Sequence, residues 1–264
     1  MKRIEKTFAE LKGKGEKALV AYITAGYPDL ATTRRLIPAL ERAGVDILEV
    51  GVPFSDPTAD GPVIQAASQA ALKNGATLDR VLGLVGELRG SVRIPLVLFS
   101  YYNPIFSMGG EAFAVRASDA GVDGALVVDL PFEEAAELRR YTDPAGIDFI
   151  TLVAPTTGAD RVKKVVKAAT GFIYYISVTG VTGTRGPEME ETRATVEAIR
   201  SLTERPVVVG FGVSTPEQAR QIGGLADGVV VGSAFVKLIG DRAGDPDLIA
   251  AVEAYAASLK AALR

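Results

Sequence analysis

Short apolar runs recur along the chain, and between them apolar residues return every three or four positions. Runs of the first kind are typical of buried parallel strands, and the second spacing is typical of helices with one apolar face. The apolar runs predict eight strands, at residues 18–24, 47–50, 96–99, 125–128, 149–153, 173–176, 207–209 and 229–231.

The helical spacing between these runs predicts a helix after every strand. The expected helices cover residues 30–43, 77–88, 111–120, 133–141, 160–169, 190–202, 215–222 and 248–263, with extra helices at 4–11, 63–74 and 233–239. Strands that alternate with helices favour a parallel sheet, and eight such units favour a closed (β/α)8 TIM barrel. We therefore predict one α/β domain over residues 1–264, with an extra N-terminal helix and extra helices after strands two and eight. An open doubly wound sheet is the alternative.

Two connections are longer than the others. Residues 51–62 are rich in proline, glycine and aspartate, and residues 177–187 are rich in glycine and threonine. Long loops in compact domains are commonly functional. In a barrel both loops would follow the C-terminal ends of strands, which is the face where barrel enzymes have their active sites.

Glu49 is an acidic residue inside an apolar run, Ile47-Leu48-Glu49-Val50. If side chains alternate along this strand, Glu49 points into the barrel while its two neighbours face the helices. Burial disfavours a charged carboxylate, so we expect a raised pKa that lets Glu49 act as acid and base in turn. The alternative is a structural glutamate bound to backbone groups at the barrel rim.

Asp60 is a second carboxylate, near the end of the loop that follows this strand. Aspartate before Gly-Pro is common in turns and at helix N-termini, and Asp56, before Pro57, is open to the same interpretation. Carboxylates of such a loop could also hold Mg²⁺. The acids here are not spaced as a run of metal ligands, and we expect no metal site.

Glycines follow the last three predicted strands. They lie in the segments 180–183, 210–214 and 232–234, and the last of these begins a predicted helix. Backbone N–H groups of such loops, together with the N-terminus of an extra helix, form the usual phosphate site of a barrel. Ordinary turn formation is the alternative for any one of the three segments.

Composition removes several kinds of chemistry. The 264 residues include no cysteine and no histidine, which excludes thiolate nucleophiles, histidine bases and the common zinc sites. No lysine ends a predicted strand, as a Schiff-base aldolase would require. A net charge of −3 gives no case for nucleic-acid binding. Because we see no signal peptide and no apolar run of membrane-spanning length, we expect a cytoplasmic protein without a membrane partner.

Two stretches carry a specific resemblance, LEVGVPFSDPTADGP at residues 48–62 and SVTGVTG at residues 177–183. Together with shorter matches at 211–214 and 232–234, they resemble the α subunit of tryptophan synthase, and the resemblance covers essentially the whole chain. It implies a lyase of tryptophan biosynthesis. The implied reaction is the retro-aldol cleavage of indole-3-glycerol phosphate to indole and glyceraldehyde 3-phosphate.

The resemblance also implies roles for single residues. Glu49 resembles the acid and base that serves indole C3 and the glycerol hydroxyl, and Asp60 resembles the group that holds and deprotonates the indole N–H. The other matching positions are Tyr174 near Glu49, Thr182 as a lid residue that bonds Asp60, Tyr22, Phe99 and Leu126 in the indole pocket, and Gly183, Gly212, Gly232 and Ser233 at the phosphate.

The family works as an α₂β₂ complex, which implies a partner for this chain. The β subunit carries pyridoxal phosphate and receives indole through a tunnel, so we expect no cofactor in this chain. The residues implied at the interface with the β subunit are Pro53, Phe54, Ser55, Asp56, Pro57 and Thr58, and segment 177–187 resembles a mobile lid.

Two other functions remain open from the residues alone. One is a different phosphate-binding barrel enzyme, an isomerase or synthase, although such enzymes typically use a lysine, cysteine or histidine at a strand end. The other is a non-catalytic barrel that binds a sugar phosphate and regulates a partner enzyme. The second would bind phosphate ligands without turnover and would be indifferent to the loss of Glu49.

Overall fold

The computed structural model describes residues 1–176, 187–210 and 212–264, and it has the predicted barrel. The strands lie in the order β5-β4-β3-β2-β1-β9-β8-β7-β6, and every neighbouring pair is parallel. Their bounds are β1 Ala18–Thr24, β2 Ile47–Gly51, β3 Leu96–Ser100, β4 Gly124–Val127, β5 Asp148–Phe149, β6 Thr151–Val153, β7 Ile173–Ile176, β8 Val207–Gly210 and β9 Gly228–Val231. The barrel is confirmed, and the open sheet is excluded because the first and last strands of this order are joined through Ile150 alone.

The predicted fifth strand, residues 149–153, is divided in the structure. Its first part, β5, pairs with β4, and its second part, β6, pairs with β7. Ile150 lies between them and donates its N–H to Ala125 of β4 over 2.9 Å. The break therefore marks where the chain passes from one neighbouring strand to the other, which local apolar spacing does not predict.

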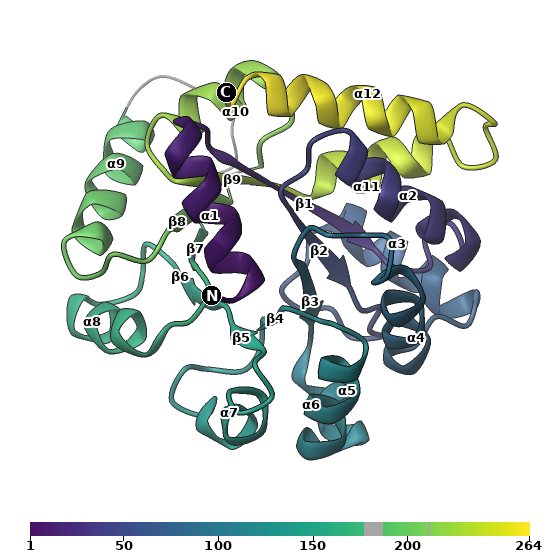
Figure 1. The fold of residues 1–264 in the computed structure, drawn as a ribbon, viewed down its shortest axis with the longest axis horizontal. Coiled ribbons are helices and arrows are strands. Elements are labelled where there is room, and N and C mark those ends of the chain that lie inside the picture. Colours follow the sequence, from purple (N-terminus) through teal and green to yellow (C-terminus); the bar gives the residue numbers. More distant parts are fainter. Residues whose placement is uncertain (177–186, 211) are drawn as a thin grey trace.

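Helices surround the strands, as Figure 1 shows. The described helices are α1 Arg3–Lys14, α2 Leu30–Arg42, α3 Pro62–Lys73, α4 Leu78–Leu88, α5 Tyr102–Met108, α6 Gly110–Asp119, α7 Ala136–Thr142, α8 Ala159–Ala168, α9 Pro187–Arg200, α10 Pro216–Gly223, α11 Ser233–Asp241 and α12 Leu248–Ala261. Every predicted helix is present with shifted ends. Helix α9 begins earlier than predicted because its proline is tolerated at the first helical position, where no intrahelical N–H bond is needed.

Helix α5 was not predicted. It follows β3 directly, and its first residue, Tyr102, donates its N–H to the carboxylate of Asp129 over 2.7 Å. Asp129 lies in the loop after β4, so this end of the helix is capped by a residue far along the chain. A helix of seven residues that depends on such a contact leaves only a weak local pattern in the sequence.

Side chains alternate between two apolar layers, as the strand pattern predicts. Leu48 and Val50 belong to the outer layer between strands and helices, whereas Ile47 belongs to the layer inside the barrel. The other strand residues of the inner layer are Ala18, Val20, Val97, Leu126, Tyr174, Val208 and Val230. Helix α1 covers the bottom of the barrel with Ile4, Phe8 and Leu11, and lies across the strands in Figure 1.

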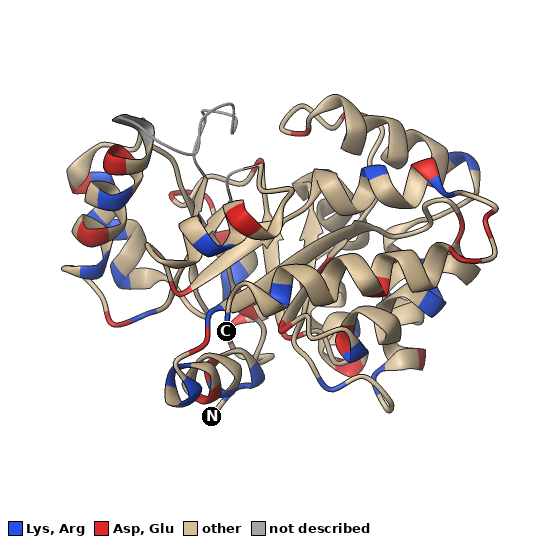
Figure 2. Ribbon diagram, turned by 90° about the horizontal axis from the view of Figure 1, so that it is seen from above, with Lys and Arg blue, Asp and Glu red and all other residues tan. Residues whose placement is uncertain are grey.

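Basic and acidic residues are interspersed along the outer helices in Figure 2. Exposed pairs such as Arg42 with Glu253, 2.6 Å apart, join neighbouring helices. Pairs of this kind contribute about 0–1 kcal/mol each, so the apolar layers stabilise the fold more than the surface charges do.

Among the described residues, the bottom rim has the same type of hydrogen bond, from a backbone N–H to a side chain, at four places. In each case a side chain that lies just before one strand accepts a backbone N–H from a strand earlier in the chain. The bonds run from Leu19 to Asp46 (2.7 Å), Leu96 to Asp123 (2.8 Å), Phe149 to Thr170 (2.7 Å) and Val207 to Asp227 (2.9 Å). We refer to these four bonds as the rim clamps. Each clamp satisfies an N–H group at a strand end that the sheet leaves unpaired.

Lys260 of α12 is a buried cation beside one of these clamps. Its side chain is only 4% exposed, and its ammonium lies 3.0 Å from both Asp46 and Glu16. It also donates to the carbonyl of Lys17 over 3.1 Å. Lys260 therefore joins the last helix, the chain before β1 and the rim clamp of Asp46.

We predict that Lys260→Ala lowers the free energy of unfolding by about 3 kcal/mol, because two carboxylates would lose their buried counter-ion. Urea denaturation followed by circular dichroism measures this change. Lys164→Ala, at an exposed lysine of α8, is the matched control and should change stability by less than about 0.5 kcal/mol. Equal effects of the two substitutions would contradict the stabilising role of Lys260.

Candidate active site

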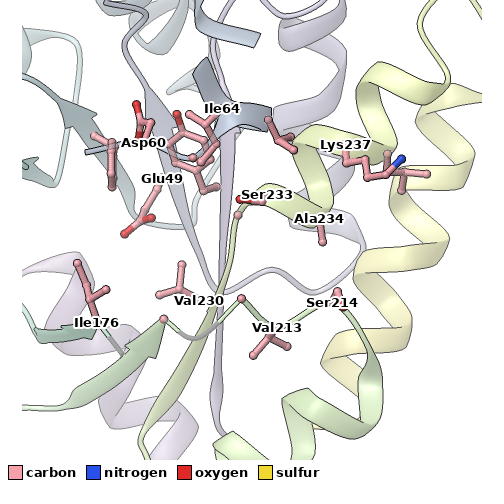
Figure 3. Close-up of a pocket in the computed structure, with 18 of the residues that line it drawn as sticks. Glu49, Asp60, Ile64, Ile176, Val213, Ser214, Val230, Ser233, Ala234 and Lys237 are labelled. Carbon is pink, nitrogen blue, oxygen red and sulfur yellow. The ribbon is translucent and has the colours of Figure 1, made fainter. Parts of the chain in front are cut away.

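A cavity of about 640 Å³ lies at the C-terminal ends of the strands, on the face where a barrel active site is expected (Figure 3). It brings together residues that are far apart in the sequence. Of the predicted site residues, those that line it are Tyr22, Glu49, Asp60, Phe99, Tyr174, Gly212, Gly232 and Ser233. Leu126 is not among the lining residues and is buried in the inner layer. Thr182 and Gly183 lie outside the described residues.

Glu49 points into this cavity from β2. It is 1% exposed and pairs in register with Tyr22 of β1 and Val97 of β3. Its Oε1 atom has no hydrogen-bond partner in the described part of the chain. Burial raises the pKa of the Glu49 carboxyl to about 8. The structure therefore gives no support for a rim glutamate that binds backbone through this oxygen, and it leaves a proton donor facing the cavity at neutral pH.

Asp60 faces the same cavity from the loop before α3 (Figure 3). The residue that precedes α3 is Gly61, so Asp60 is not the N-cap of this helix. Its backbone is held in a turn by a bond from Asp60 N–H to the Pro57 carbonyl (3.1 Å) and one from the Gln65 side chain to the Asp60 carbonyl (2.9 Å). The carboxyl is left for the cavity, where burial raises its pKa.

Tyr101 holds this loop and is not among the predicted site residues. Its side chain is almost fully buried, and its ring packs on Phe54 with 5.1 Å between ring centroids. Its hydroxyl accepts the Ala59 N–H over 2.9 Å and donates to Asp60, which opposes the rise of the Asp60 pKa. Tyr101 comes directly after β3, and a polar aromatic at a strand end was the signal that could have found it.

Two tyrosines reach the cavity because glycines give them room. A Cβ atom on Gly51 would lie 2.3 Å from the Tyr22 hydroxyl, and one on Gly210 would lie 2.5 Å from the Tyr174 hydroxyl. Both glycines end strands, β2 and β8. The ring of Tyr22 packs edge to face on the ring of Phe99, with 5.0 Å between the ring centroids. Tyr22, Phe99 and Tyr174 thus supply aromatic surface to the cavity that Glu49 lines.

The opposite end of the cavity is built from backbone. Gly212 has a left-handed φ of 63°, and Gly232 precedes α11, so no side chain caps this helix. The first N–H groups of α11 start at Ser233, which lines the cavity. A helix N-terminus and a glycine turn on one wall favour an anionic group such as phosphate. Lys237 of α11 also lines this end, a basic residue that the sequence analysis did not place there.

The predicted interface residues divide into two groups. Pro53 and Pro57 are buried and Phe54 is half-buried, whereas Ser55, Asp56 and Thr58 are exposed. The Ser55 hydroxyl donates to Asp56 over 2.6 Å. In the parts of the chain that the structure describes, no group of three or more acidic side chains is close enough to hold a metal ion.

Comparison with known proteins gives one consistent result. The family model for the tryptophan synthase alpha chain matches residues 8–264. The chain is 50% identical to the tryptophan synthase alpha chain of Desulfatibacillum aliphaticivorans over the full length of both, and 56% identical to that of Citrifermentans bemidjiense over 90% of this chain and 89% of the relative. It is also similar to the solved tryptophan synthase subunit alpha of Legionella pneumophila, at a TM-score of 0.92 and 38% identity over 100% of this chain and 98% of the other.

We predict that Tyr101→Phe raises the pKa of Asp60, because the variant keeps the ring that packs on Phe54 but loses the hydroxyl that donates to the carboxylate. Carbon-13 NMR titration of the aspartate carboxyls measures the shift. We also expect a loss of about 1 kcal/mol in unfolding free energy from the missing bond to Ala59.

Tyr102→Phe is the matched control for this prediction, since the neighbouring hydroxyl has no hydrogen-bond partner among the described residues and is only partly buried. It should leave the titration of Asp60 unchanged. An unchanged Asp60 pKa in Tyr101→Phe would show that the hydroxyl does not hold this carboxylate.

Proposed function

The chain belongs to the tryptophan synthase alpha chain family, and from that premise we propose how its cavity performs the family reaction. The protein is a lyase of tryptophan biosynthesis that cleaves indole-3-glycerol phosphate to indole and glyceraldehyde 3-phosphate. The observation that carries the assignment of roles is the buried carboxyl of Glu49, which has a pKa of about 8 and shares one cavity with Asp60.

Glu49 serves as the acid first and the base second. Its protonated carboxyl donates a proton to indole C3, which converts the ring to an indolenine with positive charge at nitrogen. The resulting carboxylate then takes the proton of the adjacent glycerol hydroxyl, and the bond between C3 and the glycerol carbon breaks. The bonding electrons return to the ring, the hydroxyl carbon becomes the aldehyde, and Glu49 ends protonated as it began. A carboxyl whose pKa lies near neutrality suits both steps.

Asp60 serves the other end of the ring. Its carboxylate accepts the indole N–H and takes up that proton as positive charge grows at the nitrogen. Asp60 returns the proton to the nitrogen when the bonding electrons re-enter the ring, so the product is neutral indole and Asp60 ends ionised as it began. Tyr101 favours this role because its hydroxyl bond to Asp60 stabilises the ionised form. Two carboxyls with different partners in one cavity thereby divide the acid and base roles.

The remaining cavity residues match the two halves of the substrate. Tyr22, Phe99 and Tyr174 supply aromatic surface for the indole ring. Leu126 pairs in register with Phe99 and is buried in the inner layer. Gly212, Gly232 and Ser233 supply backbone N–H groups for the phosphate. On the resemblance, Thr182 bonds Asp60 when the loop closes and Gly183 contributes to the phosphate site; both lie outside the described residues.

The partner of this chain is the tryptophan synthase beta subunit. We propose that residues 53–58 contact it, with Ser55, Asp56 and Thr58 exposed for this purpose. The same loop ends at Asp60, so a partner bound to it would act directly on a catalytic group. Pyridoxal phosphate belongs to the beta subunit in this proposal.

We also propose that residues 1–264 form one domain and that the protein works in the cytoplasm. Among the described residues, no helix is long and apolar enough to cross a membrane.

We predict that Glu49→Gln and Asp60→Asn each reduce indole release from indole-3-glycerol phosphate by about 10³-fold, since each removes one proton-transfer group. The assay compares wild type and variants, with and without the beta subunit. Both variants should still bind the substrate, because they keep the phosphate end of the cavity. A wild-type protein that binds the substrate but never releases indole, even with the beta subunit, would instead favour a regulatory sugar-phosphate-binding barrel.

We predict that kcat/KM falls as the pH rises above about 8, because the reaction starts from protonated Glu49. It should also fall at low pH, as Asp60 becomes protonated and can no longer take up the indole proton. A pH profile of indole release measures both limbs, and an alkaline limb that is absent would contradict the role of Glu49 as the first acid.

The free energy of unfolding should also depend on pH through the ionisation of Glu49. The pKa of Glu49 is about 8 in the folded protein, against about 4.3 in an unfolded chain, so the folded state binds more protons between these values. The stabilising contribution of this group is complete below about pH 4 and is lost as the pH rises through 8. Urea denaturation at several pH values should therefore show wild type losing stability relative to Glu49→Gln over this range.

A further inference from the structure

The cavity has an unbalanced set of charges. Among its described lining residues, the acidic ones are Glu49, Asp60 and Asp241, and the single basic one is Lys237. A phosphate monoester carries a charge of about −1.5 to −2 at neutral pH. Backbone N–H groups supply only partial positive charge, about half a charge for a whole helix N-terminus. A cation that reaches the phosphate would therefore change the electrostatics of this cavity more than any other described group.

Lys237 lines the end of the cavity formed by the N-terminus of α11, where we expect the phosphate to bind. It comes four residues after Ser233 on α11, so the two side chains lie on one face of the helix, one turn apart. Long side chains on a helix lean toward its N-terminus. The ammonium can therefore reach the N-terminal end of α11 by a change of side-chain rotamer alone.

In the structure, Lys237 is turned the other way. Its Nζ atom lies 2.6 Å from Asp241 Oδ2, and both side chains are mostly exposed, at 64% and 60%. Figure 3 shows Lys237 extended along α11, beyond Ser233 and Ala234. An exposed pair at this spacing contributes only about 0.3–0.5 kcal/mol, whereas hydrogen bonds from an ammonium to a phosphate are among the stronger ones in proteins. Releasing Lys237 from Asp241 therefore costs little free energy.

We propose that Lys237 binds the phosphate of the substrate and that Asp241 is its counter-ion before the phosphate binds. This inference rests on the proposed function and deepens it: the cavity selects ligands with a doubly charged phosphate end, and Asp241 weakens their binding by competing for Lys237. Two substitutions on one helix should then have opposite effects, which a surface ion pair without a role in binding would not produce.

Three variants test the proposal: Lys237→Gln, Asp241→Asn and, as a matched control, Lys164→Gln at an exposed lysine of α8. The readouts are the KM for indole-3-glycerol phosphate, the inhibition constant of inorganic phosphate and, as an uncharged probe, the dissociation constant of indole. We expect Lys237→Gln to raise the first two about tenfold, with a smaller effect on kcat, and to leave indole binding unchanged.

Asp241→Asn should lower the inhibition constant of inorganic phosphate about threefold, because Lys237 is then free and a competing negative charge is gone. Lys164→Gln changes the net charge of the protein as Lys237→Gln does, and it should leave all three readouts unchanged. The proposal is overturned if Lys237→Gln leaves the phosphate inhibition constant unchanged, if it weakens indole binding equally, or if Asp241→Asn weakens phosphate binding.

These outcomes are separate from a failure of the proposed function. If wild type released no indole but Lys237→Gln still weakened phosphate binding, the catalytic roles of Glu49 and Asp60 would fall and the phosphate cation would stand. If turnover depended on both carboxyls but phosphate binding did not depend on Lys237, the catalytic roles of Glu49 and Asp60 would stand and the proposal for Lys237 would fall.

Discussion

The burial of one carboxyl inside an apolar barrel is the constraint on which the rest of this structure depends. Glu49 is held between a tyrosine and a valine of the neighbouring strands, and one of its oxygens has no partner in the described residues. An unsatisfied buried polar group costs about 1–3 kcal/mol. The outer apolar layer and the clamped rim offset this cost at positions that do not touch the cavity. The fold can therefore keep a proton on a carboxyl at neutral pH.

Most of the fold could be predicted because the strand pattern repeats at a fixed period. The alternation that sends Leu48 and Val50 outward leaves Glu49 no other direction than inward, and the two apolar layers follow it. The exceptions are contacts between distant segments. Helix α5 depends on Asp129 from the next loop, and the break at Ile150 depends on which strand lies on each side. Neither is visible in a window of neighbouring residues.

The residues of the candidate site also fall into those that the sequence pattern reveals and those that depend on contacts between distant segments. Glu49 could be recognised because a carboxylate is rare inside an apolar run, and the glycine-rich end of the cavity because glycines recur after three strands. Asp60 alone was open to a simpler interpretation, since its sequence is that of a turn, and the structure shows that it is both a turn residue and a cavity residue. Tyr101 and Lys237 had no unusual neighbours in the sequence. Tyr101 matters because its hydroxyl bonds a loop from another part of the chain, and Lys237 was found only because α11 places it on the wall of the cavity.

The rim clamps have a consequence for how such a barrel assembles. Each clamp joins a strand to the segment before a later strand, and the bonded residues are 27, 27, 21 and 20 positions apart in the chain. Closing loops of this length costs little chain entropy, and contacts between nearby segments form quickly. The bottom rim is thus held at four places by bonds between segments that are close in the sequence, and none of these bonds requires another clamp. The barrel can gain its register step by step from such local bonds, whereas the pairing of β1 with β9, which joins Ala18 to Gly228, must wait for nearly the whole chain.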